Sequence, residues 1–370
     1  MKFVVLCVAA AMTAASAADS PRVLKPEDFA TLRDVDEPNI SPDGNSIAYV
    51  VKVADMEKDK RPGNLWLAKW DGSENRALTF GLKGQKHPRW SPDGKWLGFL
   101  SGREDDNEND QLWVLPIGGG EAEKITDAKG GVDDFAWSPD SKRIALVVHD
   151  PDPREPEKKE KEKKTVPPLV IDRFFFKKDI DGYLTQRYSH LQLLDLATRK
   201  IDPLTSGKHD DVWPAWSPDG KEIAFVTKRG DDPDRSENWD VWVVAAVPGG
   251  KERQLTSSPE ADPHPDWDSA PAWSPDGKWI AYLHGGDPKK ISYAVHSLAI
   301  IPAAGGPAKV LTEKLDRNIF QPHWTPDGKA IYVVVEDDGA QNLVRVPADG
   351  GAPAPVTTGR RKVTAYDVSR

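Results

Sequence analysis

The chain has 370 residues, long enough for a large hydrophobic core, and its 59 Asp and Glu outnumber its 50 Lys and Arg for a formal net charge of −9. Charges of both signs are spread along the chain, and the lack of a basic field argues against a nucleic-acid partner. With 29 Gly and 32 Pro, the sequence contains many turn-forming residues but is not low in complexity.

The first residues have the layout of a secretory signal peptide, which we assign to residues 1–18. Lys2 precedes an apolar run over residues 3–12, and small residues end it at 15–17. The run is too short to cross a bilayer, so a cleaved signal is favoured over a membrane anchor. The one cysteine, Cys7, lies inside this segment, so we expect no thiol chemistry in the mature chain and a periplasmic or secreted location without membrane attachment.

Residues 19–40 are predicted to be a polar lead-in with a short helix near 26–32, where Pro and Glu occupy a plausible first turn. A repeat begins immediately afterwards. The hexapeptide Trp-Ser-Pro-Asp-Gly-Lys occurs at 90–95, 216–221 and 273–278, and variants of it occur at 40–45, 137–142 and 324–329. Most spacings are close to 50 residues, which is typical of a repeat architecture. Ser, Pro and Gly in this order predict a type I turn.

The residues that follow each turn predict strands. The sixth and eighth residues after the Ser or Thr are apolar or aromatic in every repeat, and the residue between them is mostly Ala or Gly. This alternation predicts a strand with a second sheet close to its small-residue face. One strand before the turn, a third such as 112–114 and a short fourth that ends in an apolar residue and Thr complete a unit of four. We predict an all-β fold, a β-propeller over residues 41–370 with six complete four-stranded blades.

Two departures from the repeat stand out. The third unit contains an insertion over residues 150–189, which begins with a charged stretch and continues with the apolar and aromatic residues 170–176. We expect the aromatic part to pack against something and the insertion to be an interface device, or else a hairpin on the blade's own edge. The second departure is the C-terminus, where residues 365–369 resemble the strand that leads into each turn and predict the start of an incomplete seventh blade.

The sequence offers no catalytic constellation. It contains no Gly-x-Ser-x-Gly elbow, and no phosphate-binding loop with the required Lys and Ser or Thr. The segment 262–268 alternates possible metal ligands but lacks the glycine that a calcium loop needs, so a solvated loop is the better interpretation. We therefore expect no cofactor and no metal, and we interpret the recurrent Trp and Tyr residues as core. Arg173, Arg187 and His190, in or beside the insertion, are the candidate substrate-binding or interface residues.

With the repeat and insertion considered together, the chain resembles the N-terminal β-propeller of the prolyl oligopeptidase family of serine peptidases, particularly secreted bacterial members of dipeptidyl or acylaminoacyl peptidase type. The segments 170–173 and 182–191 carry this resemblance more specifically than the turns do. It implies a substrate filter that covers an α/β-hydrolase domain of the same full-length polypeptide, with short peptides as substrates. No catalytic residue of this family has a counterpart here, and we expect the chain to end before the catalytic domain.

The resemblance leaves the specificity and two alternatives open. Some dipeptidyl peptidases hold the amino terminus of the substrate with paired glutamates, and this sequence contains no Glu-Glu. The alternatives are a periplasmic propeller binding module of the Tol-system type and a free-standing protein-interaction scaffold. The Tol protein has a sizeable α/β domain before its blades, whereas the first turn here follows soon after the predicted cleavage site, which argues against the first alternative.

Overall fold

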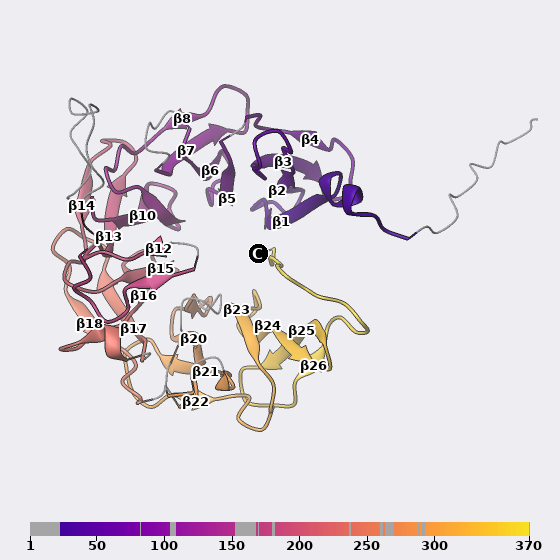
Figure 1. The fold of residues 1–370 in the computed structure, drawn as a ribbon. Coiled ribbons are helices and arrows are strands. Elements are labelled where there is room, and N and C mark those ends of the chain that lie inside the picture. Colours follow the sequence, from indigo (N-terminus) through magenta and orange to yellow (C-terminus); the bar gives the residue numbers. More distant parts are fainter. Residues whose placement is uncertain are drawn as a thin grey trace, which may run out of the picture.

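The computed structural model describes residues 23–81, 83–103, 109–151, 168, 170–179, 182–236, 238–259, 262, 270–287, 289–290 and 293–369. Six antiparallel sheets of four strands each follow one another around a ring (Figure 1). The predicted all-β propeller with six complete blades is confirmed. The predicted signal segment lies outside the described residues, and no described helix is long and apolar enough to cross a membrane.

In each blade the strands pair in chain order from the ring centre outwards, and each first strand carries the residue that precedes the turn. The blades are, in order, β1 (Arg33–Ile40), β2 (Ser46–Val53), β3 (Gly63–Lys69) and β4 (Arg76–Ala77); β5 (Gln85–Trp90), β6 (Trp96–Ser101), β7 (Gln111–Pro116) and β8 (Glu123–Lys124); β9 (Val132–Trp137), β10 (Arg143–His149), β13 (Ser189–Asp195) and β14 (Ile201–Pro203); β15 (Asp211–Trp216), β16 (Glu222–Thr227), β17 (Asp240–Ala245) and β18 (Glu252–Gln254); β19 (Ala272–Trp273), β20 (Trp279–His284), β21 (Ser297–Pro302) and β22 (Lys309–Val310); β23 (Ile319–Trp324), β24 (Ala330–Asp337), β25 (Ala340–Pro347) and β26 (Ala354–Pro355).

The repeated motif forms the turn between the first and second strands. In the second blade, Ser91 Oγ donates a hydrogen bond to Asp93 Oδ1 at 2.6 Å and accepts one from the amide of Trp96 at 3.0 Å. Gly94 adopts a φ of 71°, a left-handed conformation that costs glycine little. In the third blade Ser141 stands in that position with a φ of 58°. The motif is therefore a structural turn, as predicted.

The Trp before each turn connects neighbouring blades. The indole nitrogen of Trp137 donates to the carbonyl of Arg89 in the preceding blade at 3.0 Å, and Trp90, Trp216, Trp273 and Trp324 make the equivalent bond. The small residues of the second strands lie where two sheets approach closely. A Cβ on Gly98 would come within 2.8 Å of the Phe135 ring of the next blade. Both observations confirm that the recurrent aromatic residues pack the core between blades.

The ends of the chain differ from the predicted boundaries. The short helix is a 3₁₀ helix, η1 (Pro26–Ala30), and the first blade begins at Arg33, inside the segment interpreted as a lead-in. The expected leading strand of a seventh blade, residues 365–369, forms no ladder and has no regular secondary structure.

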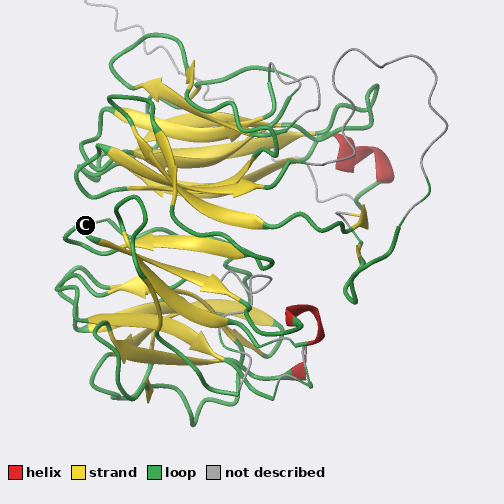
Figure 2. Cartoon of the chain, turned by 90° about the vertical axis from the view of Figure 1, so that its left-hand side faces the viewer, coloured by secondary structure: helices red, strands yellow, loops and turns green. Residues whose placement is uncertain are grey.

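The insertion connects β10 and β13 and contains a small hairpin, β11 (Lys177–Lys178) and β12 (Gly182–Tyr183). It emerges on the same side of the ring as the other loops between second and third strands and the connections between blades. We call this side the loop face and the opposite side, which carries the repeated motifs, the turn face. Figure 2 shows the hairpin on the loop face and the C-terminus on the turn face.

Candidate functional site

A polar cleft separates the insertion from the fourth blade, and we call it the insertion cleft. It has a volume of about 710 Å³. One wall consists of insertion residues around Arg173, and the other is the β16–β17 loop with the 3₁₀ helix η2 (Pro233–Arg235). Its charged lining residues are Asp172, Arg173, Lys208, Asp231, Asp232, Asp234 and Arg235, with His209 beside them. Of the three residues predicted from the sequence, only Arg173 lines this cleft.

Arg173 joins the two walls of the insertion cleft. Its guanidinium binds Asp234 with two hydrogen bonds of 2.8 and 2.6 Å and donates a third to the carbonyl of Thr185 at 2.8 Å. The side chains of Arg173 and Asp234 are only 9% and 15% exposed. Burial alone would raise the pKa of Asp234, but the hydrogen bonds and charge of Arg173 outweigh it and lower that pKa. Arg173 therefore anchors the insertion to the fourth blade.

The aromatic run that follows Arg173 remains partly exposed. The exposed fractions are 60% for Phe174, 39% for Phe175 and 41% for Phe176. The guanidinium of Arg235 lies 4.5 Å from the centre of the Phe174 ring, a cation–π contact across the cleft. Phe174 thus meets the expectation that this run packs against something through the contact with Arg235. A rigidly anchored, exposed aromatic surface is instead suited to meet another part of the protein or a ligand.

Arg187 fixes the other end of the insertion. Its Nε donates to the carbonyl of Asp150 at 2.7 Å, and its Nη2 donates to the carbonyl of Gly130 at 3.4 Å. Both carbonyls belong to the loop face of the third blade. Arg187 therefore holds the two ends of the insertion together and does not point into the insertion cleft.

His190 lies behind the insertion cleft in a buried polar cluster. Its Nδ1 is 3.3 Å from Oδ2 of the fully buried Asp211, and its ring packs edge-on against His209 at a centroid distance of 6.2 Å. Burial would lower the pKa of His190, but the hydrogen bond to Asp211 and the charges of Asp211 and Asp150 raise it overall. Burial lowers the pKa of His209, which faces the cleft. His190 thus contacts Asp211 behind the insertion cleft and does not line the cleft itself.

The third blade also brings a serine, a histidine and an aspartate together. Ser189 Oγ donates to Asp133 Oδ2 at 2.9 Å and lies 2.5 Å from His149 Nδ1, while the same histidine nitrogen is 3.1 Å from Asp133. A catalytic triad needs the serine and the aspartate on opposite nitrogens of the imidazole. Ser189 is also buried, with 3% of its surface exposed. This cluster is a structural polar network and does not form a nucleophile with its base.

The described residues contain no group of three or more His, Cys, Asp or Glu side chains placed to bind a metal ion. Most of the segment 262–268, which alternates possible ligands, lies outside the described residues. Its first residue, Asp262, is fully buried and lies 2.8 Å from His284 Nδ1. Asp262 therefore has a structural partner.

Sequence reasoning missed Asp234, Asp211 and His209. Asp234 lies in a charged loop that resembles a solvated turn, so the sequence gives no sign of its partner. Asp211 does have a signal: it follows Thr205 by six residues, as Gln85 follows Thr79, and both pairs are hydrogen-bonded. An alignment of the Thr positions would have indicated a polar site at the start of four blades, since Asp262 and Asn318 also follow a Thr by six residues.

Comparisons with known proteins agree with this architecture. Residues 182–288 match the family described as "Dipeptidyl peptidase IV (DPP IV) N-terminal region". The chain is 27% identical to Dipeptidyl-peptidase 5 of Porphyromonas gingivalis, with 97% of this chain and 53% of that protein covered. It is 29% identical to the uncharacterized peptidase YuxL of Bacillus subtilis, with 60% of this chain and 34% of that protein covered. The chain thus spans about a third to a half of these relatives.

Solved structures give the same result for the fold. An acylaminoacyl peptidase of Pyrococcus horikoshii matches 92% of this chain with a TM-score of 0.68 and 19% identity, over 49% of its own length. The β-propeller domain of the Trilobed protease from Pyrococcus furiosus matches 91% with a TM-score of 0.62 and 18% identity, over 89% of that domain. Fold, insertion and sequence matches define a peptidase-associated β-propeller. The family-model match and the relatives support an N-terminal propeller of a peptidase of the prolyl oligopeptidase family.

Proposed function

We propose that this propeller is the substrate-gating and cleft-forming part of a secreted serine peptidase that acts on short peptides. In this proposal the α/β-hydrolase catalytic domain belongs to the same full-length polypeptide and lies outside these 370 residues. The observation that carries the proposal is the anchored insertion: Arg173 and Asp234 hold an exposed aromatic run beside a polar cleft. The last eight residues of the insertion, 182–189, are included in the match to the dipeptidyl peptidase region.

The distribution of apolar side chains supports the loop face as the side that meets the catalytic domain. Large exposed apolar residues occur there in several blades, namely Met56, Phe80, Ile171, Phe174, Phe175, Phe176, Tyr183 and Tyr293. On the turn face, the described residues of this kind are Trp70 and Val247. Exposed apolar surface concentrated on one face is typical of an interaction site. A catalytic domain on this face would enclose the insertion cleft.

The first test is the coding sequence beyond Arg370. We expect an Asp-Gly turn within a few residues and, after the propeller, a Gly-x-Ser-x-Gly elbow with later Asp and His. A stop codon directly after Arg370 in the native gene would reject the peptidase proposal. We also expect the 370-residue chain alone to hydrolyse no peptide p-nitroanilide above the blank, and inhibitor-sensitive turnover would reveal a catalytic site that the proposal lacks.

The second test uses the full-length protein. Replacing Arg173 or Arg187 by alanine releases one end of the insertion, so KM for a short peptide should rise or kcat should fall. Arg199→Ala is a suitable control, because Arg199 pairs with Glu123 on the exposed surface of the third and second blades. Unchanged kinetics in both insertion variants would show that the insertion has no role in the reaction.

The binding-module alternative has less support. A putative TolB from Agrobacterium tumefaciens matches 82% of this chain with a TM-score of 0.50 and 18% identity, below the values for the acylaminoacyl peptidases. No specific site on the described residues favours a Tol-type partner over a catalytic domain. The peptidase proposal therefore takes precedence over both the Tol-type module and the free-standing scaffold.

A further inference from the structure

The insertion begins and ends at a mostly buried cluster of charged and titratable side chains, which we call the root cluster. Its members are Asp150, His190, His209, Asp210 and Asp211, with Arg229 beside them. Asp150 is the first residue of the insertion. Ser189, the last residue, donates its backbone amide to Asp210 Oδ1 at 2.9 Å. The root cluster therefore contacts both ends of the insertion.

A single buried carboxylate lies at the centre of the root cluster. Asp211, the first residue of β15, is fully buried, and its Oδ1 accepts a hydrogen bond from Arg229 at 3.0 Å. His190 on β13 and His209 in the loop before β15 lie 3.3 and 3.6 Å from this carboxylate. The two imidazoles pack edge-on against each other. A proton on one histidine therefore changes the affinity of the other for a proton.

His190 can hold a proton between two carboxylates. Its Nδ1 faces Asp211, and its Nε2 lies 3.9 Å from Asp150 Oδ2. Although burial favours the neutral ring, the hydrogen bond to Asp211 and the charges of Asp211, Asp150 and Asp210 raise the pKa of His190 overall. The charged form of His190 therefore ties Asp150, at the start of the insertion, to the first strand of the fourth blade.

His209 has the opposite environment. Its buried Nε2 makes no hydrogen bond to the described residues, and a Cβ on Gly207 would lie only 2.2 Å from its Cε1, so the ring fills a space that only glycine leaves open. Burial lowers the pKa of His209, and the charges of Arg229 and His190 lower it further. The charges of Asp211 and Glu252 oppose this only in part. On its other side, His209 borders the insertion cleft.

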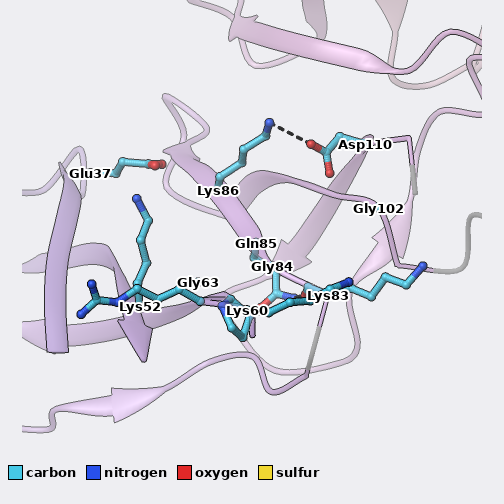
Figure 3. A pocket seen from close by; sticks show the side chains of 12 residues that line it. Glu37, Lys52, Lys60, Gly63, Lys83, Gly84, Gln85, Lys86, Gly102 and Asp110 are labelled. Atoms are coloured by element: carbon cyan, nitrogen blue, oxygen red, sulfur yellow. Dashed lines mark hydrogen bonds and ion pairs between the residues drawn. The ribbon is translucent and has the colours of Figure 1, made fainter. Parts of the chain in front are cut away.

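The position of Asp211 does not require a carboxylate in every blade. Gln85 in the second blade follows Thr79 by six residues, as Asp211 follows Thr205, and its neutral amide accepts the threonine hydroxyl at 2.7 Å. Gln85 lies at a pocket between the first and second blades, and the described residues that line this pocket include no histidine (Figure 3). The charge of Asp211 is therefore not needed to satisfy the threonine.

We propose that the root cluster is a proton-operated clamp on the insertion, closed when His190 alone carries a proton and opened when His209 is protonated as well. In the closed state His190 holds Asp150, and the loop that carries His209 also carries Asp210, which holds the end of the insertion. The clamp concerns the insertion itself and does not depend on the proposed peptidase function.

The second proton opens the clamp through the loop before β15. It places an imidazolium on His209 beside the charged His190 and Arg229, in a space without a hydrogen-bond acceptor for its Nε2. The ring then turns into the insertion cleft, where Asp231 is among the lining residues. Because Asp210 is the next residue, this movement weakens its bond to the amide of Ser189. Acid should therefore free the insertion and widen the cleft.

The clamp should be tightest near the ordinary histidine pKa of about 6.5. His190, whose pKa is raised, contributes stability that is present below this pH and is lost as the pH rises through its folded pKa. His209, whose pKa is lowered, favours the folded state as a neutral ring, and this contribution is lost as the pH falls. Protection of the insertion should thus decline on both the acid and the alkaline side.

Hydrogen–deuterium exchange of the 370-residue chain at pH 5, 6.5 and 8 tests the clamp. Each variant is compared with the wild type at the same pH, in peptides that end at residue 189, so the intrinsic exchange rates cancel. In His209→Gln, exchange should be about two- to fivefold slower than in the wild type at pH 5 and equal at pH 6.5. In His190→Gln it should be about two- to fivefold faster at pH 6.5, with a smaller effect at pH 8.

Two further variants are controls. His284→Gln changes a histidine that also contacts a buried aspartate, Asp262 at 2.8 Å, but in the fifth blade, and it should leave the insertion unchanged. Arg173→Ala should accelerate exchange equally at all three pH values, because the pKa of Asp234 is lowered and both groups stay charged. An unchanged rate at pH 5 in His209→Gln, or equal acceleration at pH 6.5 and 8 in His190→Gln, would overturn the clamp.

Nuclear magnetic resonance titration of histidines labelled at ¹³Cε1 gives an independent measurement. The variants His190→Gln and His209→Gln identify the two resonances by their loss. Removing the charge of His190 should raise the pKa of His209 towards its ordinary value, and an unchanged titration of His209 would contradict the shared carboxylate. Peptides of β6 report global opening of the chain, and where a variant opens globally the titration decides the outcome.

Discussion

The carboxylate of Asp367 accepts a hydrogen bond from the backbone amide of Ile40, 327 residues earlier in the chain, at 2.7 Å. It also accepts one from Asn39 Nδ2 at 3.1 Å. The neighbouring Tyr366 donates its hydroxyl to the carbonyl of Tyr332 in the sixth blade at 2.9 Å, and burial raises its pKa so that it stays a donor. Two adjacent residues therefore join the sixth blade to the first, where Ile40 replaces the Trp that connects the other blades.

We expect Asp367→Ala to open this junction without unfolding the blades. Loss of hydrogen bonds to a charged acceptor should cost about 1.5–3 kcal/mol locally. The measurement is hydrogen–deuterium exchange of peptides that contain β1, which should exchange faster in the variant. Asp127→Ala is the control, because the Asp127 side chain is 89% exposed and pairs only at the surface with Lys124. Unchanged exchange in β1 would show that Asp367 does not hold the junction.

The Arg173–Asp234 pair should stabilise the insertion far more than a similar pair on the surface. Arg199 binds both oxygens of Glu123 at 2.9 Å, but those side chains are 42% and 60% exposed. Removing Arg173 leaves a mostly buried carboxylate without its partner, at a cost of about 1.5–3 kcal/mol, whereas an exposed pair contributes about 0–1 kcal/mol.

Limited proteolysis of the insertion can compare the buried Arg173–Asp234 pair with the exposed Arg199–Glu123 pair. Arg173→Ala and Asp234→Ala should both accelerate cleavage within the segment that follows residue 150, and Arg199→Ala should not. A double variant of Arg173 and Asp234 should resemble the singles, because the two residues act through one interaction. Additive effects of the two single changes would argue against a coupled pair.

The fold was predictable because its signals are local. Each turn depends on a serine or threonine and an aspartate two residues later, followed by a glycine in every blade but the third, where Ser141 stands. The hydroxyl donates a hydrogen bond to the aspartate in all six blades. The prediction missed strand β1, and so placed the start of the first blade too late. The β1 sequence, Arg-Asp-Val-Asp-Glu-Pro-Asn-Ile, lacks the alternation and the Trp of the later first strands. Its strand character comes from pairing with β2.

The candidate site was only partly predictable. Arg173 was identified through the unusual insertion, but its partner Asp234 lies 61 residues away in another blade, and no local pattern specifies such a pair. His190 was selected for its place beside the insertion, yet it occupies the position of Gln111, Asp240 and Asn342 at the start of a third strand. A polar residue repeated at this position indicates that His190 has a structural role. Its contact with Asp211 agrees with that role.

The threonine at the end of each blade should be important for stability. In the second blade Thr126 Oγ1 accepts a hydrogen bond from the amide of Leu112 at 2.9 Å and donates one to Gln111 at 2.9 Å, and both groups are buried. Thr126→Val keeps the shape but leaves the amide unsatisfied, so the free energy of unfolding should fall by about 1–3 kcal/mol in urea titrations. Thr126→Ser keeps the oxygen and should cost less, and an equal loss in both variants would contradict the role of the hydroxyl.

The last prediction concerns Asp240, which is 9% exposed and whose pKa is raised to about 6, mainly by burial, with a contribution from the charge of Asp262. The unfolded chain releases this proton near pH 4, so between pH 4 and 6 the folded state binds more protons. Stability contributed by this group is therefore present below pH 4 and lost as the pH rises to 6.

The substitution Asp240→Asn should remove this loss of stability between pH 4 and 6. Asn342 occupies the same position in the sixth blade and accepts the threonine hydroxyl at 3.0 Å, as Asp240 does at 2.9 Å, so an amide fits the site. Gln254 can turn its amide so that its oxygen faces the new group. We expect the variant to exceed the wild type by about 1–2 kcal/mol at pH 7.5, after allowance for solvent screening, and to match it near pH 4. Urea unfolding at several pH values measures the difference, and a difference that does not grow between pH 4 and 6 would contradict the raised pKa.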